Sequence, residues 1–240
     1  MKLFSSFAGF LMLASTSNAG LAEPERDTVV LVHGMGRTRS SMMELERHLR
    51  REGFRVINFG YRSTRQPVEA SALELQQTLE RDAHGRNGRV HFVTHSLGGI
   101  IVRACLKEHR PGNLGRVVML SPPNQGSEVA DKLRNNLLYK WATGPAGQQL
   151  GTTLDSVPNQ LGPVDFTVGV IAGSRSLNPL FSTWIDGPSD GKVGVARSRV
   201  EGMADFLVVP RSHTYIMRSP RVIAQVARFL REGSFDHPPA

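Results

Sequence analysis

Ser96 lies where an apolar run gives way to a pair of glycines, and this position favours a nucleophile. Residues 90–94 are typical of a buried strand, and residues 97–109 are typical of a helix. A serine at a sharp turn between a strand and a helix forms a nucleophile elbow. There, backbone strain exposes the hydroxyl and the first amides of the helix point at the substrate. The pattern therefore indicates covalent chemistry at Ser96.

The residues around Ser96 fit such an elbow with one departure. Gly98 allows the start of the helix to lie against the end of the strand, where a side chain would collide with backbone, and Gly99 extends that freedom. Thr94 stands two residues before the serine, where the usual motif has glycine. Ser-Leu-Gly-Gly after an apolar run also occurs in ordinary strand-to-helix connections, so other residues must decide between the two interpretations.

A serine hydroxyl becomes a good nucleophile when a base removes its proton and a buried acid holds that base. Of the eight histidines, His213 lies in a loop between the predicted last strand and the predicted last helix. His48 and His84 lie on or beside polar helix faces, His109 lies at a helix end, and His237 lies in the tail. His91 and His95 lie on or next to the elbow strand. The last two have metal-ligand spacing, but a strand gives them no helical face and no third ligand is evident. His213 is the predicted base.

The acid is expected between the serine and the histidine in chain order. Four carboxylates qualify: Asp186, Asp190, Glu201 and Asp205. Asp190 follows a proline and a serine and precedes a glycine, in a turn that can direct its carboxylate back toward the site. Asp186 also precedes a glycine and is the closest rival. We favour Asp190, and an ordinary loop turn remains the alternative for either residue.

An ester or amide carbonyl also needs an oxyanion hole, made of two backbone N–H groups that face the developing negative charge. The amide of Leu97, directly after the candidate nucleophile, is one expected donor. The other should come from the loop after the first predicted strand, where Gly34 and Gly36 flank Met35. We predict the Met35 amide as this donor, and we expect His33 to shape the loop by hydrogen bonding.

The elements that must position these residues alternate between strand and helix. Predicted strands occupy residues 28–32, 55–59, 90–94, 116–120, 168–172 and 206–209, and predicted helices occupy residues 40–52, 67–83, 97–109 and the segment from residue 220. Ser41 and Glu44 have capping-box spacing, and Ser219 is the expected cap of the last helix. This alternation predicts an α/β fold, a mostly parallel sheet with helices on both faces.

Two long segments interrupt the alternation, at residues 122–165 and 173–204. Both follow strands, and the loops after the carboxyl ends of parallel strands build the site in such sheets. Residues 131–141 mix apolar and basic side chains in an amphipathic pattern that favours a small cap or lid, or contact with lipid. We expect Leu177, Phe181 and Trp184, together with Leu180, to wall a substrate pocket, with packing onto the core as the alternative.

Length and composition favour one domain in an exported protein. The chain has 240 residues, 40% of them hydrophobic, which supports one substantial core. Residues 1–19 have a lysine near the start, an apolar stretch and a small-residue cleavage site, and they predict a secretory signal peptide and a secreted or periplasmic location. The domain is then residues 20–240. Cys105 is the single cysteine, so no disulfide within the chain is possible, and a buried inert thiol is expected.

The net charge of +8 predicts acidic partners of some kind. The arginines are scattered and no basic run is interleaved with aromatic residues, which argues against nucleic-acid binding. Among partners, an anionic membrane surface is the one that this charge favours in an exported protein, but we prefer the simpler interpretation of a merely solvated basic surface.

Taken together, the motifs resemble those of the α/β-hydrolase superfamily. More narrowly, the chain is similar to small bacterial lipases and esterases and to glycosylphosphatidylinositol inositol-deacylase-like hydrolases. The resemblance spans residues 28–235 and rests on Leu31-Val32-His33-Gly34-Met35-Gly36, residues 94–99, residues 121–127, residues 189–193 and residues 212–214. It implies a triad of Ser96, Asp190 and His213, oxyanion donors at Met35 and Leu97, and no metal or organic cofactor.

The sequence thus predicts a serine hydrolase that cleaves carboxylic esters, among them lipid esters, through an acyl-enzyme. Two alternatives stay open: an acyltransferase with the same triad, and a non-catalytic binding or chaperone-like protein on a hydrolase scaffold. Nucleotide binding is disfavoured. Gly34 and Gly36 lack the third glycine of a dinucleotide motif, and residues 187–193 are one residue short of a phosphate-binding loop and lack its serine or threonine.

Overall fold

The computed structural model describes residues 26–83 and 88–237. The predicted signal peptide, residues 1–19, lies outside the described residues, so export remains a prediction. Within the described ranges, none of the helices combines the length and the apolar composition that crossing a bilayer requires.

In the part of the chain that the structure describes, six parallel strands form one sheet in the order β2-β1-β3-β4-β5-β6. The strands are β1 (Thr28–Val32), β2 (Arg55–Phe59), β3 (Val90–His95), β4 (Leu114–Leu120), β5 (Val168–Gly173) and β6 (Asp205–Val209). Every residue of β1 and β5 is buried, which explains why their sequences are continuous apolar runs without alternation. The strand β3 lies between β1 and β4, so its carboxyl end is at the centre of the sheet.

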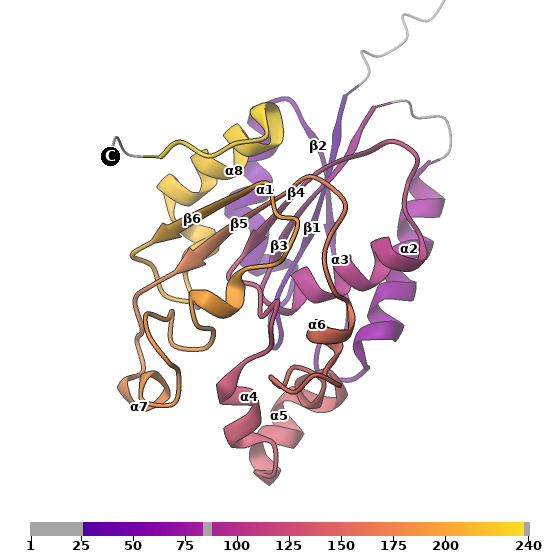
Figure 1. Ribbon diagram of the computed structural model, residues 1–240. Coiled ribbons are helices and arrows are strands. Elements are labelled where there is room, and N and C mark those ends of the chain that lie inside the picture. The colour runs from indigo at the N-terminus through magenta and orange to yellow at the C-terminus, as the bar shows by residue number, and fades with distance from the viewer. Residues whose placement is uncertain (1–25, 84–87, 238–240) are drawn as a thin grey trace, which may run out of the picture.

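Helices cover both faces of the sheet, which confirms the predicted α/β class (Figure 1). The helices α1 (Met43–Arg51) and α8 (Pro220–Glu232) pack on one face, and α2 (Val68–Ala83) and α3 (Leu97–Glu108) pack on the other. Each pair closes its own apolar cluster. One is centred on Leu75 and Ile100, and the other on Leu45 and Phe229.

The predicted strands and helices agree with the structure to within one or two residues, except at the first helix. This segment divides into a 3₁₀ turn, η1 (Arg39–Met42), and α1. The capping box was the wrong interpretation: Met42 is the N-cap, and the Ser41 hydroxyl donates to the Thr38 carbonyl at 2.8 Å. Ser219 is the N-cap residue of α8, but its hydroxyl makes no capping hydrogen bond.

The two long insertions carry short helices at the carboxyl end of the sheet. Residues 122–165 contain α4 (Glu128–Leu133), α5 (Leu137–Gln148) and α6 (Val157–Gln160). Residues 173–204 contain α7 (Pro179–Ser182) and the 3₁₀ turn η2 (Ala196–Ser198), and another such turn, η3 (Ile216–Arg218), precedes α8. Figure 1 shows α4, α5 and α7 gathered at one end of the molecule. The amphipathic pattern at residues 131–141 is not one helix, because it crosses the break between α4 and α5.

Candidate active site

Ser96 occupies the turn between β3 and α3 in a strained backbone conformation. Its φ is 53° and its ψ is −124°, a combination of backbone angles that residues other than glycine rarely adopt. The Ser96 N–H donates to the Leu120 carbonyl of β4 at 2.9 Å, and the Ser96 carbonyl accepts from the Gly99 N–H at 2.9 Å. These bonds fix the turn on both sides. The local geometry is that of a nucleophile elbow.

Two glycines allow the close approach of backbone that this turn needs. A Cβ atom at Gly98 would overlap the Val32 carbonyl oxygen at the end of β1, so the predicted collision with strand backbone is confirmed. A Cβ atom at Gly34 would lie 2.7 Å from His95 Nδ1 and 3.1 Å from the Ser96 Cβ. Thr94 fits where glycine is usual because Gly99 leaves it room: a Cβ at that position would lie 3.3 Å from the Thr94 hydroxyl.

The serine, histidine and aspartate singled out from the sequence form one hydrogen-bonded chain. His213 Nε2 lies 3.0 Å from Ser96 Oγ, and His213 Nδ1 lies 2.8 Å from Asp190 Oδ2. All three side chains are buried. Because an ionised carboxylate only accepts, Nδ1 carries the proton and Nε2 is free to accept one from the serine hydroxyl. The backbone ties the base to the acid as well, since the His213 N–H donates to the Asp190 carbonyl at 3.1 Å.

The carboxylate of Asp190 is held by donors on all sides. Its Oδ1 accepts from the Lys192 N–H at 3.0 Å and from the Val193 N–H at 2.9 Å. Burial alone would raise the pKa of Asp190. The neighbouring His213 and the hydrogen bonds to the carboxylate outweigh it, and the pKa lies below the ordinary value of 3.8. The acid is therefore ionised at neutral pH although it is buried.

Ser121 is a residue of this site for which the sequence predicted no role. It follows β4 and has a φ of 47°, the second positive φ among non-glycine residues of the described chain. Its hydroxyl donates to the Asp190 carboxylate, and it accepts from the Gly173 N–H at 3.3 Å. The available signal was its place at a strand end, immediately before two prolines.

The other carboxylates considered for the acid lie elsewhere. Asp186 and Glu201 are exposed, and neither is bonded to His213. Asp205 begins β6 and accepts from the Phe235 N–H at 2.7 Å, at the opposite end of that strand from the site. The geometry therefore brings Asp190, and not its rivals, to the histidine.

The two amides expected to form an oxyanion hole are free to donate. Within the described residues, neither the Met35 N–H nor the Leu97 N–H makes a hydrogen bond. The loop that carries Met35 is held by the Gly36 N–H, which donates to Ser63 Oγ at 3.1 Å, and by His33 Nδ1, which donates to the Gly34 carbonyl at 2.9 Å. Burial lowers the pKa of His33, so this side chain is neutral and structural, as expected.

His95 supports the base from the other side. Its Nε2 donates to the carbonyl oxygen of His213 at 2.9 Å, and the two ring centroids lie 4.8 Å apart. Complete burial holds the pKa of His95 well below 6.5, and His213 reinforces this effect. The ring is therefore a neutral donor, and it fixes the backbone of the His213 loop. The only signal for this contact in the sequence was the proximity of His95 to the serine.

A cavity of about 430 Å³ opens onto Ser96 and His213. Most of its apolar lining comes from α4, α5 and the segments that flank them: Pro123, Val129, Ala130, Leu133, Tyr139, Ala142 and Leu150. Phe181 of α7 also lines it, as predicted. The expectation was wrong for Leu177 and Trp184, which do not line the cavity. Leu177 is 61% exposed, and Trp184 stacks on Phe181 with centroids 5.2 Å apart.

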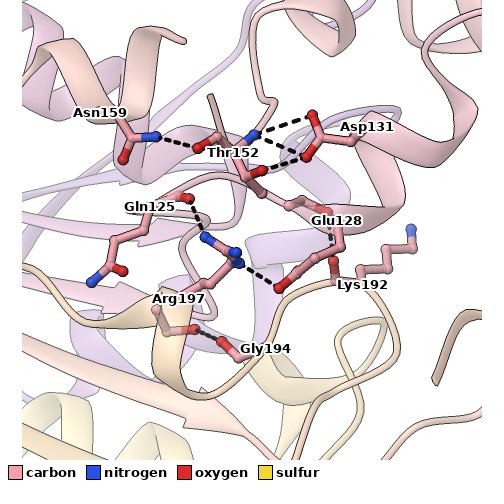
Figure 2. Close-up of polar contacts among 10 residues, drawn as sticks. Gln125, Glu128, Asp131, Thr152, Asn159, Lys192, Gly194 and Arg197 are labelled. Carbon is pink, nitrogen blue, oxygen red and sulfur yellow. Dashed lines mark hydrogen bonds and ion pairs between the residues drawn. The ribbon is translucent and has the colours of Figure 1, made fainter. Parts of the chain in front are cut away.

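Polar contacts join the two insertions beside this cavity (Figure 2). The Ser127 hydroxyl donates to the Lys192 carbonyl at 2.8 Å, and Arg197 forms an ion pair with Glu128 at the start of α4. The end of α4 is held by Asp131, which accepts from the Thr152 N–H and hydroxyl. The bond to Lys192 fixes the start of α4 to the loop that carries Asp190, the pair with Arg197 fixes it to η2, and the bonds of Asp131 hold α4 within its own insertion.

Across residues 26–83 and 88–237, no cluster of three metal-ligating side chains occurs. His91 and His95 have separate partners: His91 Nδ1 accepts from the Arg116 N–H at 2.9 Å. Cys105 is buried in α3, and burial raises the pKa of its thiol to about 12, so it is not a nucleophile at neutral pH.

We compared the sequence and the structure with those of known proteins. A model of the alpha/beta hydrolase family matches residues 29–233. No curated protein matches the sequence. The mature form of a Bacillus licheniformis lipase has a TM-score of 0.66 and 18% identity, over 81% of this chain and 88% of that one.

Two further structures are similar at low identity. The phospholipase PlaB from Legionella pneumophila has a TM-score of 0.65 and 20% identity, and the match covers 87% of this chain but 60% of that one. A metagenomic carboxyl esterase has a TM-score of 0.62 and 17% identity, over 80% of this chain and 66% of that one. At such identities the likeness shows the fold.

Proposed function

Because the chain belongs to the alpha/beta hydrolase family, we propose that it is a serine hydrolase that cleaves carboxylic esters through an acyl-enzyme. The observation that carries the proposal is the hydrogen-bonded chain from Ser96 through His213 to Asp190, with distances of 3.0 and 2.8 Å. The strained backbone of Ser96 and the free amides beside it add support. The lipase and esterase names among the structural neighbours agree with this substrate class.

In the proposed reaction, Ser96 Oγ attacks the ester carbonyl carbon while His213 Nε2 takes the hydroxyl proton. The charge on the imidazolium is stabilised by the ionised Asp190, whose pKa lies below its ordinary value. The carbonyl oxygen becomes an oxyanion that the N–H groups of Met35 and Leu97 bind. Each such donor stabilises the transition state by about 3 kcal/mol.

Collapse of this intermediate breaks the bond to the alcohol, and His213 gives its proton to the departing oxygen. The acyl group then remains on Ser96 Oγ. A water molecule attacks the acyl carbonyl while His213 accepts one of its protons, and the same two amides bind the second oxyanion. This second intermediate collapses as the bond between the acyl carbon and Ser96 Oγ breaks, and His213 returns its proton to Ser96 Oγ. The products are a carboxylic acid and an alcohol, and the enzyme returns to its starting protonation state.

We further propose that the ester is a lipid ester taken from an anionic membrane surface. The helix α5 supports this, because Leu137, Leu138 and Trp141 are 80%, 76% and 85% exposed next to the cavity lining. Lys132, Arg134 and Lys140, which are close to them in sequence, are exposed as well. An exposed apolar surface on a segment that also exposes cations is typical of proteins that lie on anionic bilayers.

The test of the proposed chemistry is labelling by a fluorophosphonate together with hydrolysis of p-nitrophenyl butyrate. The wild-type protein is expected to be labelled and active, and a Ser96→Ala variant to be neither. Equal labelling and turnover in the variant would refute the proposal. A fully unlabelled wild-type protein would favour the non-catalytic scaffold, and product partitioning to an added alcohol over water would favour an acyltransferase.

A matched pair of variants tests the acid. We expect Asp190→Asn to lower kcat by up to about 10⁴-fold, because the histidine would then be held in the wrong tautomer. Asp186→Asn is the control, since this aspartate is exposed and is not bonded to the base. A loss of activity in the control alone would contradict the assignment.

Membrane association is tested by sedimentation with phosphatidylcholine vesicles that contain or lack phosphatidylglycerol. Binding is expected with the anionic vesicles, and a Leu137→Ser/Trp141→Ser double variant is expected to lose it. A matched Leu73→Ser variant removes an exposed leucine of α2 and should bind like the wild type. Equal binding by the wild type and the double variant would contradict the proposal.

A further inference from the structure

Among the described residues, two cations line the cavity of Ser96 without forming an ion pair. Arg37 lies in the loop after β1, and Lys192 lies in the loop that contains Asp190. Both contribute to the lining of the cavity that contains Ser96 and His213. In the part of the chain that the structure describes, the charged groups of Arg37 and Lys192 make neither a hydrogen bond nor an ion pair.

The neighbouring carboxylates are committed to other groups. Both oxygens of Asp190 accept hydrogen bonds, from the backbone of its own loop and from His213. Glu128 pairs with Arg197. Figure 2 shows the Lys192 side chain extending away from that pair. Among the described residues that line the cavity, none is an aspartate or a glutamate.

The two positive charges act on the site and on each other. The pKa of Lys192 is lowered by desolvation and by the charge of Arg37, and the charge of Asp190 opposes this decrease without reversing it. The pKa of buried His95, beside the nucleophile, is lowered by burial and by His213, and Lys192 and Arg37 add to this effect. Two like charges held near one another are relieved when an anion binds between them.

We propose that Arg37 and Lys192 form an anion-binding subsite, so that the substrate is an ester whose alcohol part carries a phosphate or a carboxylate. This inference rests on the proposed ester hydrolysis. Arginine and lysine are the side chains that bind such groups, arginine through its planar fork and lysine as a point charge. The cavity would thereby distinguish anionic esters from neutral esters of the same size.

The cavity has an apolar part and a charged part, and this arrangement indicates that the anionic group belongs to the alcohol part of the ester. The acyl chain fits the apolar wall that α4 and α5 provide, with Val129, Leu133 and Tyr139 in it. Lys192 belongs to the loop whose aspartate holds His213. Because His213 protonates the departing alcohol in the proposed reaction, a cation beside that loop faces the alcohol and its substituents.

The test compares three soluble butyryl esters, of glycerol 3-phosphate, of glyceric acid and of glycerol. For each protein, the readout is the ratio of kcat/KM for an anionic ester to kcat/KM for the neutral ester, so that general damage to the site cancels. In the wild type we expect a ratio of about ten or more at low salt, and a decrease as salt is raised. The phosphate and carboxylate arms identify the preferred anion.

We expect Arg37→Gln and Lys192→Gln each to lower this ratio about threefold or more, because each removes one charge from the subsite. Arg39→Gln is the control. Arg39 is an exposed arginine close to Arg37 in sequence that does not line the cavity, and its loss should leave the ratio unchanged. A wild-type ratio near one, or equal ratios in the wild type and both cavity variants, would overturn the inference.

A binding measurement separates this inference from the proposed function. Titration calorimetry measures the binding of hexyl phosphate, and of hexanol as its neutral counterpart, without any turnover. If no ester is hydrolysed, the proposed function fails. Tighter binding of hexyl phosphate to the wild type than to Arg37→Gln then still supports the subsite, and equal binding to both overturns it.

Discussion

At the scale of single residues, the carboxylate of Asp190 is the best-supported group in the site. Two backbone amides, His213 and the Ser121 hydroxyl donate to it. A buried carboxylate needs such donors to stay ionised, and its ionisation stabilises the charged histidine during the reaction. Ser121 therefore acts on the reaction through Asp190, as a positioning residue.

We predict that Ser121→Ala lowers kcat about tenfold with little change in KM, because one hydrogen bond to a charged group is lost. Steady-state kinetics with p-nitrophenyl butyrate measures this. Ser41→Ala is the matched control, since Ser41 is also buried and also bonded, to the Thr38 carbonyl at 2.8 Å, but it does not line the cavity. A kcat of Ser121→Ala equal to that of the control would show that Ser121 has no such role.

Residue identity and chain order were enough to choose the serine, the histidine and the aspartate that the structure brings together. They were not enough for Ser121 and His95, because the partners of these residues, Asp190 and His213, lie on loops that are distant in sequence. The same limit explains why Leu177 and Trp184 do not line the cavity as expected. Their apolar character predicted contact with the cavity, but the loop leaves Leu177 exposed and stacks Trp184 on Phe181.

At the scale of elements, α5 depends on a kink at Gly144. This residue has a φ of 61° and a ψ of −159°, and Pro145 follows it within the helix. A Cβ atom at Gly144 would overlap the Thr64 carbonyl oxygen, so the backbone of α5 lies directly against the loop after β2. The kink thus sets the direction of the exposed first half of α5.

We predict that Gly144→Ala destabilises the protein and lowers activity, because the substitution adds a steric clash to backbone strain. Gly162→Ala is the matched control. Gly162 has a φ of 67°, and nothing lies within 4 Å of an added Cβ, so strain alone should cost about 1–2 kcal/mol. Urea unfolding of both variants measures the difference. Equal losses of stability would show that the contact with Thr64 is unimportant.

The strands were predictable because full burial on both faces leaves long apolar runs, as in β1 and β5. The helices of the insertion at residues 122–165 were not. Residues 131–141 do have an amphipathic composition, but a break falls inside them and the side chains of Leu137 and Trp141 face solvent. Hydrophobic pattern predicts an element when one of its faces is buried, and this condition fails for the first half of α5.

At the scale of the whole molecule, alternation of strands and helices predicted the parallel sheet but not its strand order. The chain passes from β1 to the edge strand β2, returns to β3 beside β1, and then continues outward through β4, β5 and β6. This reversal puts β3, and with it Ser96, in the middle of the sheet. The loops after β1, β4 and β5 then surround the serine and supply Met35, Ser121 and Asp190.

The fold also keeps three histidines neutral, and this predicts how stability depends on pH. Burial lowers the pKa of His33, of His91 and of His95 below the ordinary value of 6.5. Asp27 opposes the effect at His91 without reversing it. Above about pH 6.5 these groups are neutral in both the folded and the unfolded chain, so they add no pH dependence there.

As the pH falls below about 6.5, the unfolded chain binds protons at these histidines while the folded chain does not, so the free energy of unfolding decreases. The lowered pKa of Asp190 acts in a separate and more acidic window, below its ordinary value of 3.8. Urea unfolding at pH 8, 7, 6 and 5 should therefore show a plateau followed by a decline. His33→Gln and His95→Gln should each flatten the decline, because each removes one group that takes up a proton on unfolding. Constant stability from pH 8 to pH 5 would mean that the buried histidines do not control it.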